Sequence, residues 1–209
     1  EIGRFSPLTY ARDVKVFPHD TQTLLGALSI AAVSDAGALY RSADLGATWT
    51  RFDHDVSIDS TLMIIATSAQ TRERVYCAAR RGQVFGTEDG GKSFREDRFE
   101  KIHPDCHALA IDPRHPKRLL LGTDGGVYVS YDRGANWEHL DHLALGQFYH
   151  VAVDNRHPYR VYGGLQDNGT WGGPSQTLRP SGPGNPDYQL IGGGDGFVCR
   201  VDPSNPDLV

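Results

Sequence analysis

The sequence predicts an all-β repeat protein, and three segments of similar pattern carry that prediction. The segments are SADLGATW (42–49), TEDGGKSF (87–94) and SYDRGANW (130–137). Their aspartates, Asp44, Asp89 and Asp132, recur at spacings of 45 residues (89 − 44) and 43 residues (132 − 89). A fixed period in this range is typical of a repeat architecture.

Each segment has the composition of a β-hairpin turn. The aspartate can accept hydrogen bonds from amides just downstream, as in an Asx-turn. A glycine supplies the positive φ that closes the hairpin, and an aromatic residue begins the next strand with a large apolar face. A hydroxyl residue can add a bond across the turn. The residues expected in these structural roles are Ser42, Asp44, Gly46 and Trp49, then Thr87, Asp89, Gly91 (or Gly90) and Phe94, and finally Ser130, Asp132, Gly134 and Trp137.

A second turn recurs in phase with the first. It reads DPRHP at 112–116, DNRHP at 154–158 and DPSNP at 202–206, at spacings of 42 residues (154 − 112) and 48 residues (202 − 154). Strand-like segments flank it, for example HALAID (107–112) and RLLLGTDGGVYVS (118–130). The common period of these elements makes a chance arrangement implausible.

The SADLGATW-type turn resembles the Asp-box, or BNR repeat, of β-propeller proteins. That resemblance implies four-stranded antiparallel blades, with the first strand lining a central channel and the fourth outermost. The expected blades are 14–52, 62–95, 107–140 and 149–178, with an incomplete fifth at 195–209. The fourth has no good Asp-box, because the glycine- and proline-rich segment 172–187 is expected to be a long loop. We expect a partial propeller whose remaining blades come from a longer parent chain.

In such blades the Asp-boxes and the Asp-Pro turns share one face, and the opposite face carries three distinctive acids. These are Asp124 in GTDGG, Asp167 in LQDNGTW and Asp195 in GGGDGF, all flanked by glycines that leave a carboxylate uncovered. Asp167 and Asp195 are candidates for general acid and base, or acid and nucleophile, in glycoside hydrolysis. The alternative is that each acid only closes its own turn, which we favour for Asp124.

The same face holds the other candidate ligand-binding residues. Together with Asp124 these are Asn168, Trp171 and Phe197. Trp171, Phe148, Tyr149 and Phe197 are aromatic residues that could line a sugar subsite, although such residues more often pack between blades.

The second half of the chain resembles the sortilin-type group of Asp-box propellers, which includes bacterial BNR-repeat glycosyl hydrolases. The segments that carry this resemblance are GGLQDNGTWGGPS (163–175), GGGDGF (192–197) and VDPSNP (201–206). It implies a large propeller that binds protein or carbohydrate in or across its tunnel, outside the cell or in the periplasm. Secreted Asp-box enzymes include sialidases and xyloglucanases, but the chain has no Phe/Tyr-Arg-Ile-Pro tetrapeptide, for which Arg4-Phe5-Ser6-Pro7 is a poor substitute.

Other classes of site are not expected. Calcium binding would require an alternating series of oxygen ligands that the Asp-x-x-Gly turns lack. The histidines of HPDCH (103–107) and HLDH (139–142) have no known zinc spacing, and GGGDGF lacks the lysine of a phosphate loop. We therefore expect neither a metal nor a cofactor.

Composition excludes two further functions. A net charge of −5 with 22% charged residues offers no electrostatic footprint for nucleic acid, and no apolar run is long enough for a transmembrane helix. Cys77, Cys106 and Cys199 are odd in number and widely spaced, so we expect buried thiols at strand positions rather than disulfides. The sequence thus predicts a ligand-binding propeller, with a secreted glycoside hydrolase and a structural scaffold as alternatives.

Overall fold

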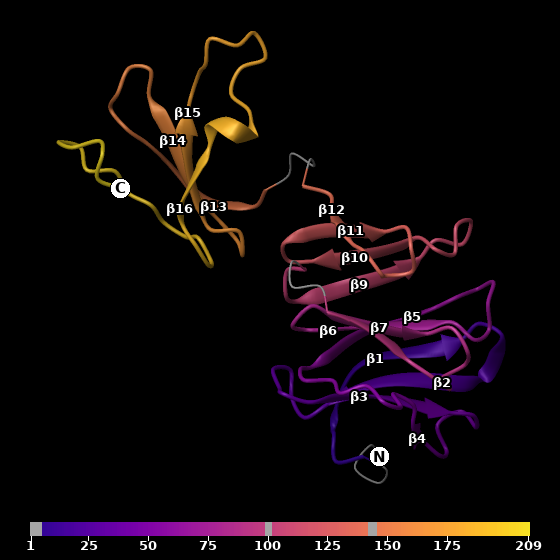
Figure 1. The fold of residues 1–209 in the computed structure, drawn as a ribbon. Helices are drawn as coiled ribbons and strands as arrows, with labels where there is room; N and C mark the ends of the chain where they lie inside the picture. The colour runs from indigo at the N-terminus through magenta and orange to yellow at the C-terminus, as the bar shows by residue number, and fades with distance from the viewer. Residues whose placement is uncertain (1–5, 99–101, 142–145) are drawn as a thin grey trace. The chain divides into compact units, whose positions relative to one another are not determined.

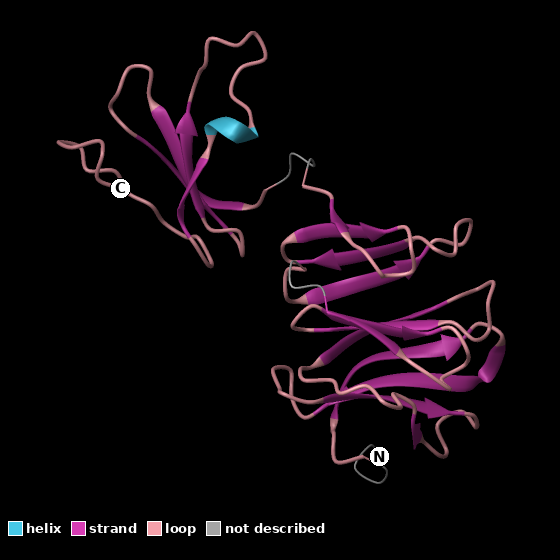
Figure 2. Cartoon of the chain, viewed as in Figure 1, coloured by secondary structure: helices cyan, strands magenta, loops and turns pink. Residues whose placement is uncertain are grey.

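The computed structural model describes residues 6–98, 102–141 and 146–209, which form strands and almost no helix (Figures 1 and 2). The chain divides into two compact units, Glu1–His142 and Leu143–Val209. These described residues form four four-stranded sheets, in which each strand pairs with its chain neighbours. All of these pairings are antiparallel. The predicted all-β architecture of four-stranded antiparallel blades is confirmed.

The first unit holds three sheets. The first sheet consists of β1 (Tyr10–Phe17), β2 (Asp20–Ser29), β3 (Gly37–Ser42) and β4 (Thr50–Arg51). The second consists of β5 (Leu62–Thr67), β6 (Val75–Ala79), β7 (Gln83–Thr87) and β8 (Arg95–Arg98). The third consists of β9 (Cys106–Ile111), β10 (Leu119–Thr123), β11 (Gly126–Ser130) and β12 (Glu138–His139).

The described residues of the second unit, 146–209, form one sheet and the 3-10 turn η2. The strands are β13 (Phe148–Val153), β14 (Arg160–Leu165), β15 (Thr170–Pro174) and β16 (Gln189–Gly192), and the turn is η2 (Asn185–Asp187). Among the described residues, no helix has the length and apolar character needed to cross a membrane.

The fourth sheet differs from the sequence prediction. Residues 172–174 were expected in a loop but belong to β15, and β16 lies beyond residue 178, where the blade was expected to end. A Cβ at Gly172 would lie 2.7 Å from the Tyr162 ring, and one at Gly173 would lie 2.4 Å from the Tyr188 ring. The two glycines therefore serve aromatic packing on a strand rather than loop formation. Residues 195–209 contain no strand, and the incomplete fifth blade expected there remains a prediction.

The three sheets of the first unit are stacked in chain order (Figure 1). Their first strands, β1, β5 and β9, are neighbours, as expected for the inner strands of blades. Successive residues of β6 point to opposite faces of the sheet: Val75 and Cys77 pack toward the first sheet, and Tyr76 toward the third. All five residues of this strand are buried because the second sheet is covered on both sides.

Two of the three cysteines match the expectation of buried thiols. Cys77 and Cys106 are buried within the sheets, and burial raises the pKa of each thiol. Cys199 is only partly buried, because it lies in the strand-free segment after β16.

The Asp-box turns share one hydrogen-bonding pattern, which the first turn illustrates. The Ser42 hydroxyl donates to Asp44 Oδ1 (2.7 Å) and accepts from the Gly46 amide (2.8 Å). The Thr48 amide donates to Asp44 Oδ1 (2.8 Å), and its hydroxyl donates to Oδ2 (2.6 Å). Gly46 has a φ of 90°. The same pattern joins Thr87, Asp89, Gly91 and Ser93 in the second sheet, and Ser130, Asp132, Gly134 and Asn136 in the third.

Each Asp-box lies beside the turn that joins the first two strands of its own sheet. The contacts are backbone hydrogen bonds from Leu45 to Gln22 (2.9 Å), from Gly90 to Glu73 (3.0 Å) and from Arg133 to Lys117 (2.9 Å). These two kinds of turn therefore form one face, here called the Asp-box face. The loops between second and third strands, and the segments that link sheets, form the opposite face, here called the loop face.

The first-to-second-strand turn of the second sheet was not evident from the sequence. It spans residues 68–74 (SAQTRER), and the Ser68 hydroxyl accepts hydrogen bonds from the amides of Gln70 (3.3 Å) and Thr71 (3.1 Å). Asp112 accepts the corresponding amides in the third sheet. A serine thus replaces the aspartate, and the repeat persists without its sequence signature.

We expect the Asp-box carboxylates to make stability depend on pH. Hydrogen bonds lower the pKa of Asp44 to about 2, and the bond from the Thr48 side chain contributes most. Because the pKa of Asp44 is lower in the folded state, its ionised carboxylate stabilises the fold. This contribution is complete above the unfolded pKa of about 4 and is lost as pH falls toward 2. The difference in urea midpoint between the wild type and Asp44→Asn should therefore shrink from pH 5 to pH 2. A constant difference over this range would contradict the prediction, and Asp141→Asn, at an exposed position outside the Asp-boxes, is the control.

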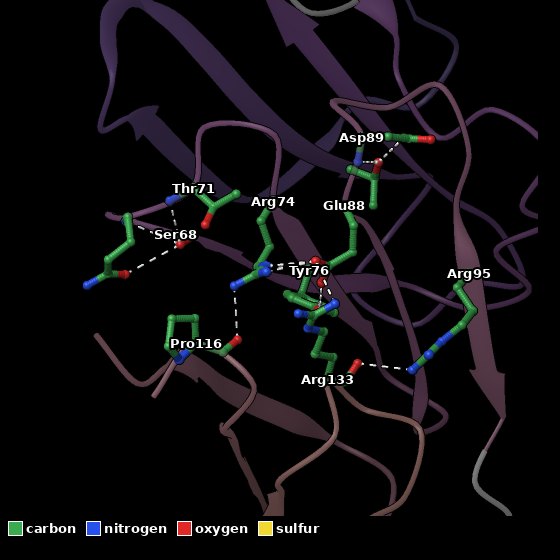
Figure 3. A network of polar contacts seen from close by, with 11 residues as sticks. Ser68, Thr71, Arg74, Tyr76, Glu88, Asp89, Arg95, Pro116 and Arg133 are labelled. Carbon is green, nitrogen blue, oxygen red and sulfur yellow. Dashed lines mark hydrogen bonds and ion pairs between the residues drawn. The ribbon is translucent and has the colours of Figure 1, made fainter. Parts of the chain in front are cut away.

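A charged network joins the second and third sheets on the Asp-box face (Figure 3). The Arg74 guanidinium donates to Glu88 Oε2 (2.8 and 3.0 Å) and to the carbonyl of Pro116 (3.0 Å). The Tyr76 hydroxyl also donates to Glu88, and Arg133 lies 3.6 Å from the same carboxylate. Arg74 is only 6% exposed, so Glu88 neutralises a buried charge at this junction.

Candidate functional site

Each of the three acids singled out from the sequence lies on the loop face of its own sheet, and the acids belong to two different units. Asp124 lies in the turn between β10 and β11 of the first unit. Asp167 lies between β14 and β15, and Asp195 follows β16, both in the second unit. The structure brings Asp167 and Asp195 together and gives Asp124 a separate set of partners.

Asp167 and Asp195 meet through a hydrogen bond from backbone to side chain. The amide of Asp167, a residue with a φ of 59°, donates to Asp195 Oδ1 (3.0 Å). Two backbone bonds flank this contact: the Gly169 amide donates to the Gly194 carbonyl (2.8 Å), and the Gly196 amide donates to the Leu165 carbonyl (2.9 Å). The segment after β16 is thereby attached along the β14–β15 hairpin.

Glycines permit this close attachment because backbone lies directly on backbone. A Cβ at Gly196 would lie 2.2 Å from the Gly169 carbonyl oxygen, and a Cβ at Gly164 would lie 2.5 Å from the Phe197 amide nitrogen. No side chain fits at either position without moving the main chain. Gly196 of GGGDGF and Gly164 of β14 therefore allow the backbone contact that positions Asp195 and Phe197.

An aromatic pair stands beside the two carboxylates. The rings of Tyr149 on β13 and Phe197 stack with centroids 4.3 Å apart and an interplanar angle of 25°. Burial raises the pKa of Tyr149, and the charges of Asp195 and Asp167 raise it further. Phe197 is 57% exposed, so the cluster presents both an aromatic surface and carboxylates to solvent.

Asn168 and Trp171 are engaged within their own hairpin. The Trp171 indole N–H donates to the Asn168 carbonyl (2.7 Å), and the Asn168 side-chain amide donates to the Gln166 carbonyl (2.9 Å). These bonds stabilise the turn that carries Asp167. A role for either residue in ligand binding remains a prediction.

Asp124 belongs to a polar cluster whose other members were not predicted as site residues. His107 Nε2 lies 2.8 Å from Asp124 Oδ1, and the Asp124 amide donates to the Asp105 carbonyl (3.3 Å). The Arg80 guanidinium forms an ion pair with the Asp105 carboxylate (2.7 Å). The available signal was the segment HPDCH (103–107), whose histidines suggest a metal site and whose Asp105 and His107 instead join this polar cluster. Within the described residues, no group of three or more His, Cys, Asp and Glu could hold a metal, and His142 lies outside them.

Asp124 and Asp167 occupy different positions in the repeat. One backbone hydrogen bond recurs in the second, third and fourth sheets. In each, the amide of the residue that follows the second strand donates to the carbonyl of the residue that precedes the first strand. It runs from Arg80 to Thr61 (2.8 Å), from Asp124 to Asp105 (3.3 Å) and from Gln166 to Gln147 (3.1 Å). Asp124 therefore corresponds to Gln166, and Asp167 is a feature of the fourth sheet.

Several solved structures share this fold. YCF48 bound to D1 peptide is 15% identical, with 91% of this chain and 56% of YCF48 covered at a TM-score of 0.50. An ancestral GH74 enzyme is 13% identical, and the superposition covers 88% of this chain and 33% of the enzyme at a TM-score of 0.50. YCF48 from Cyanidioschyzon merolae is 15% identical, and the superposition covers 80% of this chain and 54% of that protein at a TM-score of 0.49. The first two likenesses confirm the β-propeller fold, and the chain spans about half the length of YCF48.

The family was established from the sequence. No curated protein sequence matches the chain. A family model, Sortilin-Vps10, described as "Sortilin, neurotensin receptor 3", matches residues 37–168, more than half of the chain. The match includes the second and third sheets and ends at Asn168. It therefore begins earlier in the chain than expected, because the sequence resemblance was noted only in the second half. It does not include the segment GGGDGF (192–197). The chain belongs to the sortilin (Vps10) family of Asp-box β-propellers.

Proposed function

We propose that this chain is a propeller module that binds a protein or carbohydrate ligand on the loop face of the fourth sheet. One observation carries the proposal: Asp195, attached to the Asp167 hairpin, lies beside an exposed Phe197 that stacks on Tyr149. Carboxylates accept hydrogen bonds from sugar hydroxyls or from lysine and arginine side chains, and aromatic faces pack against sugar rings or cations.

The hydrogen bond from Asp167 to Asp195 fixes the Asp195 carboxylate and leaves it able to bind a ligand. It uses one oxygen of the Asp195 carboxylate, and the exposed side chain keeps its other oxygen for a ligand. Peptides belong among the ligands to test, because YCF48, which shares the fold, is described as bound to a peptide.

The test is a screen of glycan and peptide arrays with the full chain, followed by titration of any ligand found. We expect Asp195→Asn to weaken binding by roughly tenfold or more, because a charge-assisted hydrogen bond is lost. Asp35→Asn is the control, since Asp35 is an exposed aspartate in the loop between β2 and β3 of the first sheet. Binding that responds equally to both changes would refute this assignment of the site.

Glycoside hydrolysis is a second candidate, favoured by the meeting of Asp167 and Asp195. It requires two carboxyl groups about 5–5.5 Å apart for retention or about 6.5–9.5 Å apart for inversion. Asp167→Ala and Asp195→Ala should then each abolish turnover. If the wild-type chain hydrolyses none of a set of β-glucans, xyloglucans and sialosides, this candidate is eliminated while the binding proposal stands.

A further inference from the structure

The turn between β14 and β15 contains an asparagine followed by a glycine, Asn168 and Gly169. In an asparagine, the side-chain carbonyl carbon can be attacked by the amide nitrogen of the next residue, and a Cβ on that next residue hinders the approach. Glycine has no Cβ, so Asn168 is the asparagine of this chain most susceptible to such an attack. The other four asparagines precede tryptophan, arginine, proline and proline, in the order Asn136, Asn155, Asn185 and Asn205.

The folded chain exposes one of the two reacting groups and covers the other. The Asn168 side chain is exposed, whereas Gly169 is buried. The Gly169 amide, which contains the attacking nitrogen, donates a hydrogen bond to the Gly194 carbonyl (2.8 Å). A Cβ at Gly169 would lie only 2.5 Å from the Gly192 carbonyl oxygen, so the backbone after β16 lies directly against this amide. The nitrogen is therefore kept from the Asn168 side chain while that segment stays attached.

The segment after β16 is attached to the hairpin by hydrogen bonds and little packing. Its bonds are those of the Asp167, Gly169 and Gly196 amides. A Cβ at Gly193 or Gly194 would have no neighbour within 4 Å, so these two residues add no side-chain packing. A short segment held mainly by hydrogen bonds opens more often than the whole sheet unfolds. Each such opening releases the Gly169 amide.

We propose that Asn168 is a site of spontaneous deamidation, and that detachment of the segment after β16 sets its rate. The Gly169 amide loses its proton to hydroxide, and its nitrogen forms a bond to Asn168 Cγ. The bond from Cγ to Nδ2 breaks, and Nδ2 takes a proton from water and leaves as ammonia. The product is a five-membered succinimide ring, which water opens at either carbonyl to give aspartate or isoaspartate at position 168. Water is consumed and ammonia is released, and nothing is oxidised or reduced.

The isoaspartate product would change the turn that carries Asp167. Its main chain runs through Cγ, so the turn becomes longer by one carbon. The Asp167 amide, which donates to Asp195 Oδ1 (3.0 Å), would be displaced from its acceptor. This inference concerns a modification of the chain itself and does not depend on the function proposed for the loop face.

The test is peptide mapping by mass spectrometry of the full chain during incubation at mildly alkaline pH. We expect the mass gain that accompanies replacement of NH2 by OH at Asn168, and none at Asn136 or Asn155 over the same time. The reaction should be at least about tenfold faster in guanidinium chloride, where the segment no longer covers the Gly169 amide. Equal rates at the three asparagines, or equal rates in the folded and unfolded chain, would overturn the proposal.

Two glycine variants test whether detachment controls the rate. Gly196→Ala places a Cβ 2.2 Å from the Gly169 carbonyl oxygen, so it should detach the segment and accelerate deamidation by about tenfold in the folded chain. Gly193→Ala, whose Cβ would meet no neighbour within 4 Å, should leave the rate unchanged. A Gly196→Ala variant that deamidates no faster than the wild type would contradict the proposal.

Hydrogen exchange in the wild type gives a measurement that requires no variant. The protection of the Gly169 amide reports how rarely its bond to the Gly194 carbonyl opens. If opening controls deamidation, this protection should match the ratio of the unfolded to the folded deamidation rate within about threefold. Deamidation of the folded chain that is much faster than the protection allows would show that the attached conformation reacts directly, and the proposal would be wrong.

Discussion

Replacing Glu88 with alanine should lower the free energy of unfolding by about 2 to 3 kcal/mol, because a buried charge then loses its partner. Arg74 is 6% exposed and donates to Glu88 through two nitrogens, and the Tyr76 hydroxyl donates to the same carboxylate (Figure 3). The expected loss is below the value of about 3 to 5 kcal/mol for fully buried pairs, since the Glu88 side chain is 38% exposed. Urea unfolding followed by circular dichroism measures it.

The control for this prediction is Glu138→Ala, which removes an exposed glutamate from β12. A surface substitution of this kind should change the free energy of unfolding by less than about 0.5 kcal/mol. The double variant Arg74→Met/Glu88→Leu tests the cause, because removing both charges should recover much of the loss. A Glu88→Ala variant as stable as Glu138→Ala would mean that solvent satisfies Arg74 and that the network does not hold the sheets together.

Replacing Gly196 with alanine should disrupt the candidate site on the loop face. The added Cβ would lie 2.2 Å from the Gly169 carbonyl oxygen and 2.9 Å from the Gly164 Cα. Because the neighbours are backbone atoms, the segment 194–197 must move away, and the Asp167–Asp195 hydrogen bond breaks with it. We expect loss of ligand binding and a destabilisation of about 1 to 3 kcal/mol. Faster hydrogen exchange at the Asp167 amide reports the change directly.

Gly193 provides a matched control three residues away. A Cβ there would have no neighbour within 4 Å, so Gly193→Ala should leave both the hydrogen exchange and the binding unchanged. Similar effects of the two alanines would show that the segment after β16 tolerates displacement. The positioning role assigned to Gly196 would then be wrong.

The fold was largely predictable because its signature is local. The Asp-box bonds join residues no more than four positions apart, so the acid, the hydroxyl and the glycine can be recognised without knowledge of the tertiary structure. The strands of the first three sheets follow from the same period. Two features were not predicted. The turn at Ser68 was missed because it lacks an aspartate. Gly172 and Gly173 were assigned to a loop because the sequence does not show that the rings of Tyr162 and Tyr188 pack against them.

The candidate site was predictable only as a list of residues. The sequence by itself determined the repeat, the two turn types and the acids available on the loop face, because these depend on neighbours along the chain. Only the tertiary structure decided that Asp195 meets Asp167, and that Glu88 is matched by Arg74. Contacts of this kind join residues on different strands or different sheets. They are determined by strand register and sheet packing, which a local pattern does not specify.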